Sequence, residues 1–284
     1  VHLVLARLPD APAGSKGISL FIVPKFHVNP DGTLGDRNGI FCGALEHKMG
    51  IHGSATCQMR FDGADGWLIG EPHRGLAAMF LMMNAARLHV ALQGVGLLDA
   101  AWQKADGYAR ERRQMRAPVR QDPSQPADPI IEHTAVQRLL DTQRAWVHAG
   151  RVLAYSTAIE LDVAKHHPDA AQRQQANLWC ALVTPLLKAS WTDQAFHGGS
   201  DCLQVFGGHG YVREWGIEQI VRDSRVAMIY EGTNEIQAQD LLFRKVLADQ
   251  GAGLLATLGG LEQDLDRLDS AAAVRARTGL QQLR

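Results

Sequence analysis

Three long stretches of helix-like apolar periodicity limit most strongly how this chain can fold. Between Gly75 and about Arg113, apolar residues recur at mixed spacings of three and four, as they do along one side of an α-helix. A second stretch runs from about Ile130 to His166, and a third, which contains Pro185, runs from Ala170 to Phe206. Several long antiparallel helices with short connections predict a helical bundle.

Proline and glycine mark the ends of these helices. Residues 117–129 contain four prolines, which stop the first helix and predict an extended surface loop. The glycine-rich segment Gly207–Gly210 closes the third helix. A fourth helix is expected near Asn234 to Ala248, and the leucine spacing after Gly251 predicts a further amphipathic helix.

The beginning of the chain has the alternation of β-strands instead. Apolar residues alternate from Val1 to Leu5 and from Cys57 to Phe61, and Ile18–Val23 is a short apolar run that ends at Pro24. The loops between these runs are rich in turn residues, as in Asn29–Gly32. This pattern is typical of antiparallel β structure.

Length and composition agree with a globular chain of about two domains. The 284 residues allow about two domains, and 46% hydrophobic residues with 21% charged residues are typical of a globular protein. We expect an α+β fold: a partial antiparallel β domain at 1–74, an antiparallel helical bundle at 75–250, and the start of a helical extension at 251–284. Because the chain opens at Val1 inside a strand pattern and stops at Arg284 inside a helical one, we expect a piece of a longer protein.

Charge and cysteine content exclude several classes of function. A net charge of -1 and a pI near 6.9 give no basic field for nucleic acid or an anionic membrane. We count no apolar run near the roughly 18 residues that span a bilayer, and no signal-peptide pattern, so we expect a cytoplasmic protein without a membrane partner. Cys42, Cys57, Cys180 and Cys202 are scattered without metal-ligand spacing, so no metal is expected.

Two segments could bind an anion. The stretch Lys104–Arg120 carries six cationic residues against two acidic ones. Arg112 and Arg116 would stand one helical turn apart, so both guanidinium groups could face one phosphate. A solvated helix end, where cations interact favourably with the helix dipole, is the alternative interpretation. The glycine-rich segment Gln204–Tyr211 could let a ligand approach the backbone, but it follows a helix and therefore does not match a Rossmann motif.

Glu231 is the candidate general base. It follows four largely apolar residues and precedes Gly232, and a carboxylate that is shielded from water becomes more basic. Thr233 and Asn234 then begin a helix whose free N–H groups could meet an anion. From these residues alone, a structural helix cap explains the segment as well as a catalytic site does.

A set of spaced motifs resembles one enzyme family. In chain order the motifs are Asn84–Arg87, Tyr108–Gln114, Gln204–Tyr211, Arg222–Arg225 and Ile229–Gln237. Together they resemble the FAD-dependent acyl-CoA dehydrogenases, and the resemblance covers about residues 15 to 250. The segment His47–Thr56 and the proline-rich loop are most similar to the long branch that includes 3-methylmercaptopropionyl-CoA dehydrogenase, which carries an extra C-terminal helical region.

The resemblance implies a role for each matched residue. Glu231 would remove an α-proton from an acyl-CoA thioester while a hydride passes from the β-carbon to the flavin. The substrate-binding positions would be Asn84, Arg87 and Gly232. The positions that contact FAD would be Arg112, His133, Gln204, Val205, Phe206, Gly207, Gly208, Thr233 and Glu235. His133 departs from the family pattern, because many members carry a flavin-contacting glutamine there.

The implied activity is α,β-dehydrogenation of an acyl-CoA to the trans-2-enoyl-CoA. Electrons would pass to an electron-transfer flavoprotein, and the enzyme would be a homodimer or homotetramer. An acyl-CoA oxidase or a nitroalkane-oxidase-like flavoenzyme is an alternative on the same scaffold. A flavin-bearing nucleic-acid-binding relative is the non-enzyme alternative, against which Glu231 and the net charge count. Because the family's N-terminal helical domain and first β strands do not precede Val1, we expect this chain to be inactive alone.

Overall fold

The computed structural model describes residues 1–120 and 122–282, apart from the side chain of Asn84. It is an α+β structure, which confirms the expected fold class. Its contacts divide the chain into two compact units, Val1–Ala86 and Arg87–Arg284. The division falls inside helix α1 (Gly75–Glu111), so the first turns of this helix belong to the unit that holds the strands.

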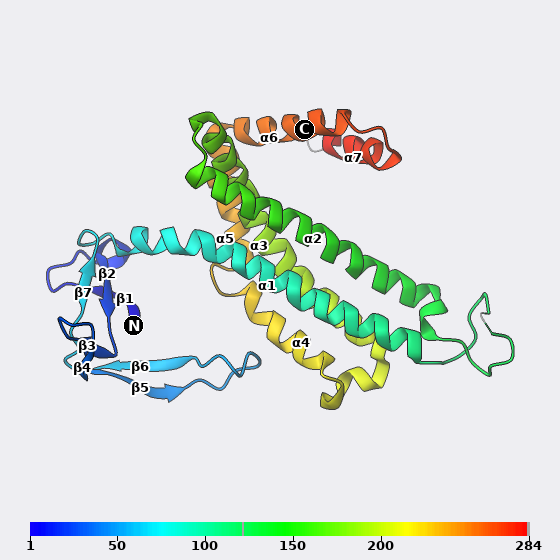
Figure 1. Ribbon diagram of the computed structural model, residues 1–284, viewed down its shortest axis with the longest axis horizontal. Coiled ribbons are helices and arrows are strands. Elements are labelled where there is room, and N and C mark those ends of the chain that lie inside the picture. Colours follow the sequence, from blue (N-terminus) through cyan, green and yellow to red (C-terminus); the bar gives the residue numbers. More distant parts are fainter. Residues whose placement is uncertain (121, 283–284) are drawn as a thin grey trace. The chain divides into compact units, whose positions relative to one another are not determined.

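The first unit contains three small antiparallel sheets (Figure 1). The strands pair in the order β1 (His2–Arg7), β2 (Ile18–Val23), β7 (Trp67–Ile69); β3 (Phe26–Val28), β4 (Leu34–Arg37); and β5 (Ile40–Leu45), β6 (Cys57–Phe61). Alternation of apolar residues predicted β1 and β6, and a short apolar run predicted β2; these three strands are confirmed. The other four strands were not predicted.

Long-range hydrogen bonds explain why alternation missed those strands. The side chain of Asn38 is 1% exposed, and its Nδ2 donates to the carbonyl oxygens of Pro24 and Asp65 at 2.9 and 2.8 Å. Its Oδ1 accepts hydrogen bonds from the N–H groups of Gly39 and Asp65. One buried amide therefore joins the segments after β2, before β5 and before β7, and this fixes short strands that have weak patterns of their own.

Three long helices form the core of the second unit. The later turns of α1 lie beside α2 (Thr134–His166) and α3 (Ala170–Phe206), as Figure 1 shows. Fully buried Leu98, Val147 and Ala195 bring one side chain from each helix into contact. Fully burying a leucine or valine contributes roughly 1.5–3 kcal/mol, so these contacts hold the helices together. The three helices that periodicity predicted are confirmed.

The helices are close enough to require glycine at one position. A Cβ on Gly150 of α2 would lie 2.0 Å from Nε1 of Trp191 on α3. That indole Nε1 donates to the carbonyl oxygen of Trp146 at 3.0 Å, so the ring cannot shift freely. Glycine therefore sets the spacing of α2 and α3.

The shorter helices agree only in part with the sequence. They are α4 (Ile217–Ser224), α5 (Asn234–Gln239), α6 (Ala252–Asp266) and α7 (Ala271–Gln282). The leucine-rich α6 was predicted, whereas α4 and α7 were missed. The single helix expected near Asn234 to Ala248 is wrong in its second half, because a π-helical turn at Asp240–Val246 follows α5. An eight-residue helix such as α4 is too short to give a clear period.

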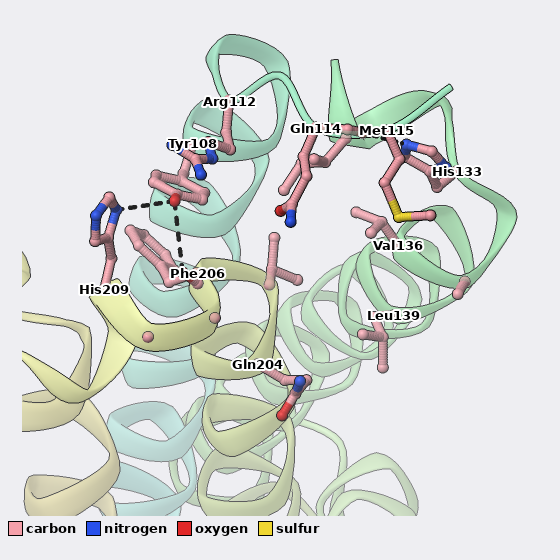
Figure 2. A pocket seen from close by; sticks show the side chains of 15 residues that line it. Tyr108, Arg112, Gln114, Met115, His133, Val136, Leu139, Gln204, Phe206 and His209 are labelled. Atoms are coloured by element: carbon pink, nitrogen blue, oxygen red, sulfur yellow. Dashed lines mark hydrogen bonds between the residues drawn. The ribbon is translucent and has the colours of Figure 1, made fainter. Parts of the chain in front are cut away.

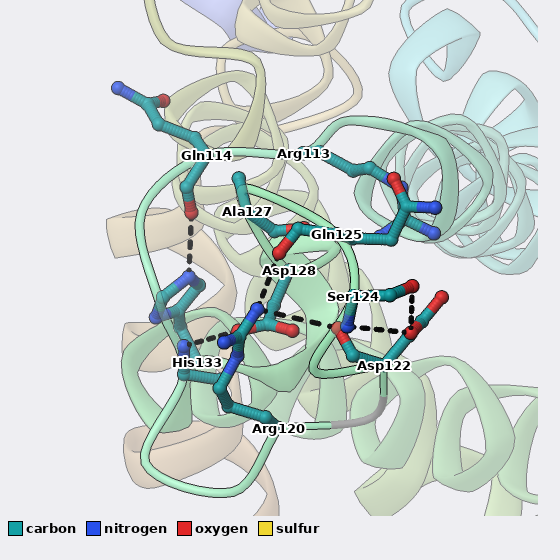
Figure 3. Close-up of polar contacts among 10 residues, drawn as sticks. Arg113, Gln114, Arg120, Asp122, Ser124, Gln125, Ala127, Asp128 and His133 are labelled. Carbon is teal, nitrogen blue, oxygen red and sulfur yellow. Dashed lines mark hydrogen bonds and ion pairs between the residues drawn. The ribbon is translucent and has the colours of Figure 1, made fainter.

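The proline-rich loop is more ordered than the extended loop we expected. Asp128 is 0% exposed; its Oδ2 accepts the N–H of Ala117 at 3.0 Å and lies 3.6 Å from Nε of Arg120 (Figure 3). The backbones of Asp128 and Met115 are also hydrogen-bonded. This buried carboxylate holds the two ends of the loop together.

The loop geometry overturns one prediction from the sequence. Helix α1 ends at Glu111, and Met115 has a φ of 58°, a left-handed conformation that cannot continue a helix. Arg112 and Arg116 are therefore not one helical turn apart. The expectation that these two arginines stand one helical turn apart was wrong, so that spacing gives no support to a shared anion site.

One described helix, α1, is long and apolar enough to cross a membrane by length and composition. This differs from our count, which found no such run in the sequence. The core helix of a globular protein meets the same criterion, and Ala101, Ala105 and Ala109 of α1 are fully buried against other helices.

Candidate active site

Seven of the nine residues predicted to contact FAD line one cavity of about 660 Å³. The cavity lies where α1 ends, α2 begins and α3 ends (Figure 2). The seven residues are Arg112, His133, Gln204, Val205, Phe206, Gly207 and Gly208. Residues that are up to 96 positions apart in the chain (208 minus 112) are thus brought together by the helical bundle.

An aromatic cluster forms one wall of this cavity. The rings of Tyr108 and Phe206 are stacked with their centroids 4.3 Å apart. The Tyr108 hydroxyl lies 3.0 Å from Nδ1 of His209 (Figure 2). The His209 ring in turn stacks on Trp215, with the ring centroids 4.7 Å apart. These contacts join the end of α1 to the segment after α3 and make the wall rigid.

Glycine opens the backbone beside that wall. Helix α3 ends at Phe206, and Gly207 has a φ of 58°, which favours glycine. A Cβ added at Gly207 or Gly208 would meet no atom within 4 Å, so open space lies beside both residues. A ligand can therefore approach the backbone at this point.

Arg112 supplies the positive charge of the cavity. Its side chain is exposed, and among the described residues its guanidinium makes no hydrogen bond or ion pair. Arg110 differs, because it is paired with Asp106 at 2.7 Å. An unpaired guanidinium, open glycine backbone and a flat aromatic wall suit the pyrophosphate and adenosine parts of a dinucleotide. The donor set of the cavity thus fits FAD.

His133 lies on the opposite side of the cavity. Its Nε2 is 2.9 Å from the carbonyl oxygen of Gln114 (Figure 3). A carbonyl oxygen only accepts, so Nε2 is the donor in this contact. His133 therefore lines the cavity with its Nε2 already bonded to the backbone.

Glu231 and Gly232 form a strained turn that does not line this cavity. Both have positive φ angles, 52° and 82°. A non-glycine residue in that region is uncommon, and such strain persists only where surrounding contacts enforce it. Glu231 is half-buried, and its Oε2 is a buried atom without a hydrogen-bond partner among the described residues. A buried carboxylate oxygen without a partner is unusual in a folded protein and marks this turn as a candidate site.

Lys188 of α3 connects this turn to the helical bundle by hydrogen bonds. The lysine is 0% exposed, and its Nζ donates to the carbonyl oxygen of Gly232 at 2.6 Å and to Oδ1 of Asn234 at 3.0 Å. Burial, aided by the positive charge of Arg87, lowers the pKa of Lys188 to about 8. We did not single out Lys188 from the sequence. The signal that could have found it is a lone lysine directly after the largely apolar run Leu182–Leu187.

Thr233 and Glu235 lie at the start of α5. The Thr233 hydroxyl accepts the N–H of Ile236 at 3.4 Å, so the predicted helix start is confirmed. Hydrogen bonds from its own backbone N–H and from Thr233 lower the pKa of the exposed Glu235. Neither residue lines the cavity. The predicted FAD contacts therefore separate into a cavity group and a turn group.

Arg87 is engaged in an ion pair. Its guanidinium lies 3.3 Å from Asp240, the first residue of the π-helical turn, and both side chains are nearly buried. Arg244 approaches the other oxygen of Asp240 at 3.3 Å. The side chain of Asn84, the third predicted substrate contact, lies outside the described residues. In the part of the chain that the structure describes, no group of three or more His, Cys, Asp or Glu side chains could hold a metal.

Known proteins share this sequence and fold. Residues 73–245 match the family model of the acyl-CoA dehydrogenase C-terminal domain. The 3-methylmercaptopropionyl-CoA dehydrogenase of Ruegeria pomeroyi is 47% identical over 251 residues, which are 88% of this chain and 42% of that protein. The broad-specificity linear acyl-CoA dehydrogenase FadE5 of Mycobacterium tuberculosis is 38% identical over 276 residues, 93% of this chain and 44% of that protein.

A solved structure agrees in fold. Caenorhabditis elegans ACDH-11 in complex with C11-CoA matches with a TM-score of 0.78 and 24% identity, over 99% of this chain and 46% of that chain. The chain belongs to the acyl-CoA dehydrogenase family, whose members are FAD-dependent flavoproteins. It spans less than half the length of the curated relatives named above.

Proposed function

We propose that the protein to which this chain belongs is an FAD-dependent acyl-CoA dehydrogenase that forms a trans-2-enoyl-CoA, with Glu231 as its base. The observation that carries the proposal is the Glu231 turn, where a carboxylate has a buried oxygen without a partner. The relatives support the substrate class, because those named above are dehydrogenases of acyl-CoA thioesters.

In this proposal Glu231 accepts the α-proton of the thioester. FAD supplies the hydride acceptor when it is bound. The N–H of Glu231 donates to the thioester carbonyl, and this polarises the bond and acidifies the α-carbon. Gly232 keeps the turn compact, because a Cβ there would lie 2.7 Å from Nε2 of Gln237. Asn84 and Arg87 are proposed to lie near the CoA part of the substrate.

The cavity would hold the phosphates and adenosine of FAD. Arg112 would bind the pyrophosphate, while Gln204 to Gly208 and His133 would surround the rest of the cofactor. Thr233 and Glu235 would contact the flavin that serves Glu231. Because the cavity and the Glu231 turn share no lining residue, we infer that the cavity holds the flavin of a neighbouring subunit, in a homodimer or homotetramer.

An electron-transfer flavoprotein would reoxidise the flavin, in the cytoplasm. An acyl-CoA oxidase is the competing function on the same scaffold. Rapid reaction of the substrate-reduced flavin with oxygen, measured by stopped-flow absorbance, would favour the oxidase. Slow reaction with oxygen and fast reaction with the electron-transfer flavoprotein would favour the dehydrogenase.

The test of the proposed function is anaerobic flavin reduction. The complete protein is loaded with FAD and mixed with butyryl-CoA and with 3-methylmercaptopropionyl-CoA, and loss of flavin absorbance is followed. We expect bleaching with at least one of these thioesters. Absence of bleaching with a series of acyl chain lengths would contradict the proposal. Residues 1–284 alone, with excess FAD, are expected to have little or no dehydrogenase activity.

A further inference from the structure

Lys188 is a fully buried lysine that the proposed chemistry does not use. It lies on α3 at 0% exposure, and its two hydrogen-bond acceptors among the described residues are both in the segment that follows Glu231. A buried ammonium is costly unless its hydrogens are bonded. Here the acceptors are the Gly232 carbonyl oxygen and Oδ1 of Asn234. The buried ammonium group of Lys188 therefore keeps its hydrogen bonds only while the turn has this conformation.

Further hydrogen bonds connect Asn234 of the turn to α3. Oδ1 of Asn234 also accepts the hydroxyl of Thr192 at 3.1 Å, and Nδ2 of Asn234 donates to the carbonyl oxygen of Ala189 at 3.1 Å. Buried Gln237 donates to the carbonyl oxygen of Glu231 at 3.1 Å. Asn234 and the carbonyl oxygens of Glu231 and Gly232 are therefore bonded, while Oε2 of Glu231 and Oε1 of Gln237 are buried without a partner among the described residues.

Charged groups from three elements face the lysine. They are Arg87 of α1, Glu235 of α5 and Glu231 itself. The two carboxylates favour the ammonium, whereas the guanidinium opposes it. A positive donor at this point attracts the carbonyl oxygen of Gly232 and so favours the positive φ angles of Glu231 and Gly232, which are strained for Glu231 but not for a glycine.

We propose that Lys188 is a positioning residue for Glu231: its hydrogen bonds to Gly232 and Asn234 hold the turn in the conformation that aims the carboxylate at the α-proton. This inference rests on the proposed function. It assigns Lys188 no contact with substrate or flavin. Loss of the donor should leave ligand binding intact and slow proton removal, because a misplacement of about 1 Å can cost about 100-fold in rate.

The experiment compares Lys188→Met with Lys165→Met in the complete flavin-loaded protein. Lys165 is an exposed lysine of α2, so the control removes the same charge from the surface. For Lys188→Met we expect flavin reduction at saturating acyl-CoA to slow by about 10- to 100-fold. Acyl-CoA affinity and flavin content should stay within about twofold of wild type. The deuterium isotope effect with α-deuterated substrate should increase, which a loss of stability alone would not cause.

Hydrogen exchange gives a readout that needs no activity. Amides of residues 229–237 should exchange faster in Lys188→Met than in wild type, while those of α2 stay unchanged. If Lys188→Met reduces its flavin at the wild-type rate and its amides at 229–237 exchange as in wild type, the inference is overturned. If Lys188→Met does not fold, Asn234→Ala removes one of the two acceptors. A reduction rate equal to wild type in that variant would also overturn it.

Failure of the inference can be distinguished from failure of the proposed function. If Glu231→Gln abolishes flavin reduction but Lys188→Met does not slow it, only the positioning role is wrong. If Glu231→Gln reduces flavin at the wild-type rate, the proposed base itself is wrong.

Discussion

The cavity beside Arg112 and the turn at Glu231 are built in opposite ways. The guanidinium of Arg112 is exposed and has no partner among the described residues, beside glycines that leave the backbone open. The Glu231 turn is tied by Lys188, and its backbone is in a strained conformation. Within the described part of the chain, the cavity offers an unpaired guanidinium beside a rigid aromatic wall, whereas most polar groups of the turn are hydrogen-bonded and Glu231 Oε2 and Gln237 Oε1 are not.

The difference indicates what each region requires from a ligand. Charge-assisted hydrogen bonds to Arg112 form only when an anion arrives, so the ligand contributes the binding energy there. At the turn, buried hydrogen bonds enforce the geometry before any ligand binds, which is how an enzyme lowers the cost of orientation. Substitutions in the cavity should therefore change cofactor retention, and substitutions in the turn should change rate.

The largest effect is expected for Glu231→Gln. The amide keeps the shape of the side chain but cannot accept the α-proton, so flavin reduction should slow by about 100- to 10,000-fold. FAD content and acyl-CoA binding should stay near wild type, because the backbone of the turn is unchanged. Anaerobic stopped-flow absorbance measures the rate, and equilibrium dialysis measures binding. Loss of FAD in this variant would contradict the proposal that substitutions in the turn change the rate and not the retention of the cofactor.

Arg112→Ala should affect the cavity alone. Loss of a charge-assisted contact to pyrophosphate costs about 2–3 kcal/mol, so FAD should be retained about 30- to 160-fold less tightly. The rate of flavin reduction per bound flavin should change little. Flavin content after dialysis, followed by single-turnover reduction, separates the two effects.

Arg116→Ala is the matched control for Arg112→Ala. Arg116 is also exposed but does not line the cavity. Arg120 is a poor control, because it pairs with the buried Asp128 and its loss would loosen the loop. Equal loss of FAD from the Arg112 and Arg116 variants would mean that the basic segment acts only as diffuse charge.

The titration of Lys188 should appear in stability. Burial lowers its pKa to about 8 from an ordinary value of 10.5. Between those values the unfolded chain keeps the proton and the folded chain does not, so the free energy of unfolding rises with pH. The difference in unfolding free energy between wild type and Lys188→Met should increase by up to roughly 2 kcal/mol from pH 7 to pH 10. Denaturant titrations at several pH values test this, and a constant difference would contradict it.

The sequence predicted the long helices and the cavity group better than the turn. The helices follow from local periodicity, and the motifs that match the family include Arg112 and Gln204–Gly208. The contact between Lys188 and Gly232 joins residues that are 44 positions apart, and no periodic pattern encodes it. The positive φ of Met115 also has no local signal, so the spacing of Arg112 and Arg116 was misjudged. Local patterns predict elements, whereas the contacts between α3 and the turn join distant parts of the chain.

The smallest effect is expected for Thr233→Ala, and it tests to which region this residue belongs. Its hydroxyl caps α5 by accepting the N–H of Ile236 at 3.4 Å, and loss of such a cap costs about 1 kcal/mol. Thr233→Ser keeps the cap and is the control. If Thr233 only caps the helix, the alanine variant loses the same unfolding free energy with and without FAD. The family resemblance predicts a larger loss with FAD, because the hydroxyl would also contact the flavin. Equal losses of unfolding free energy with and without FAD would mean that Thr233 only caps α5 and does not contact the cofactor.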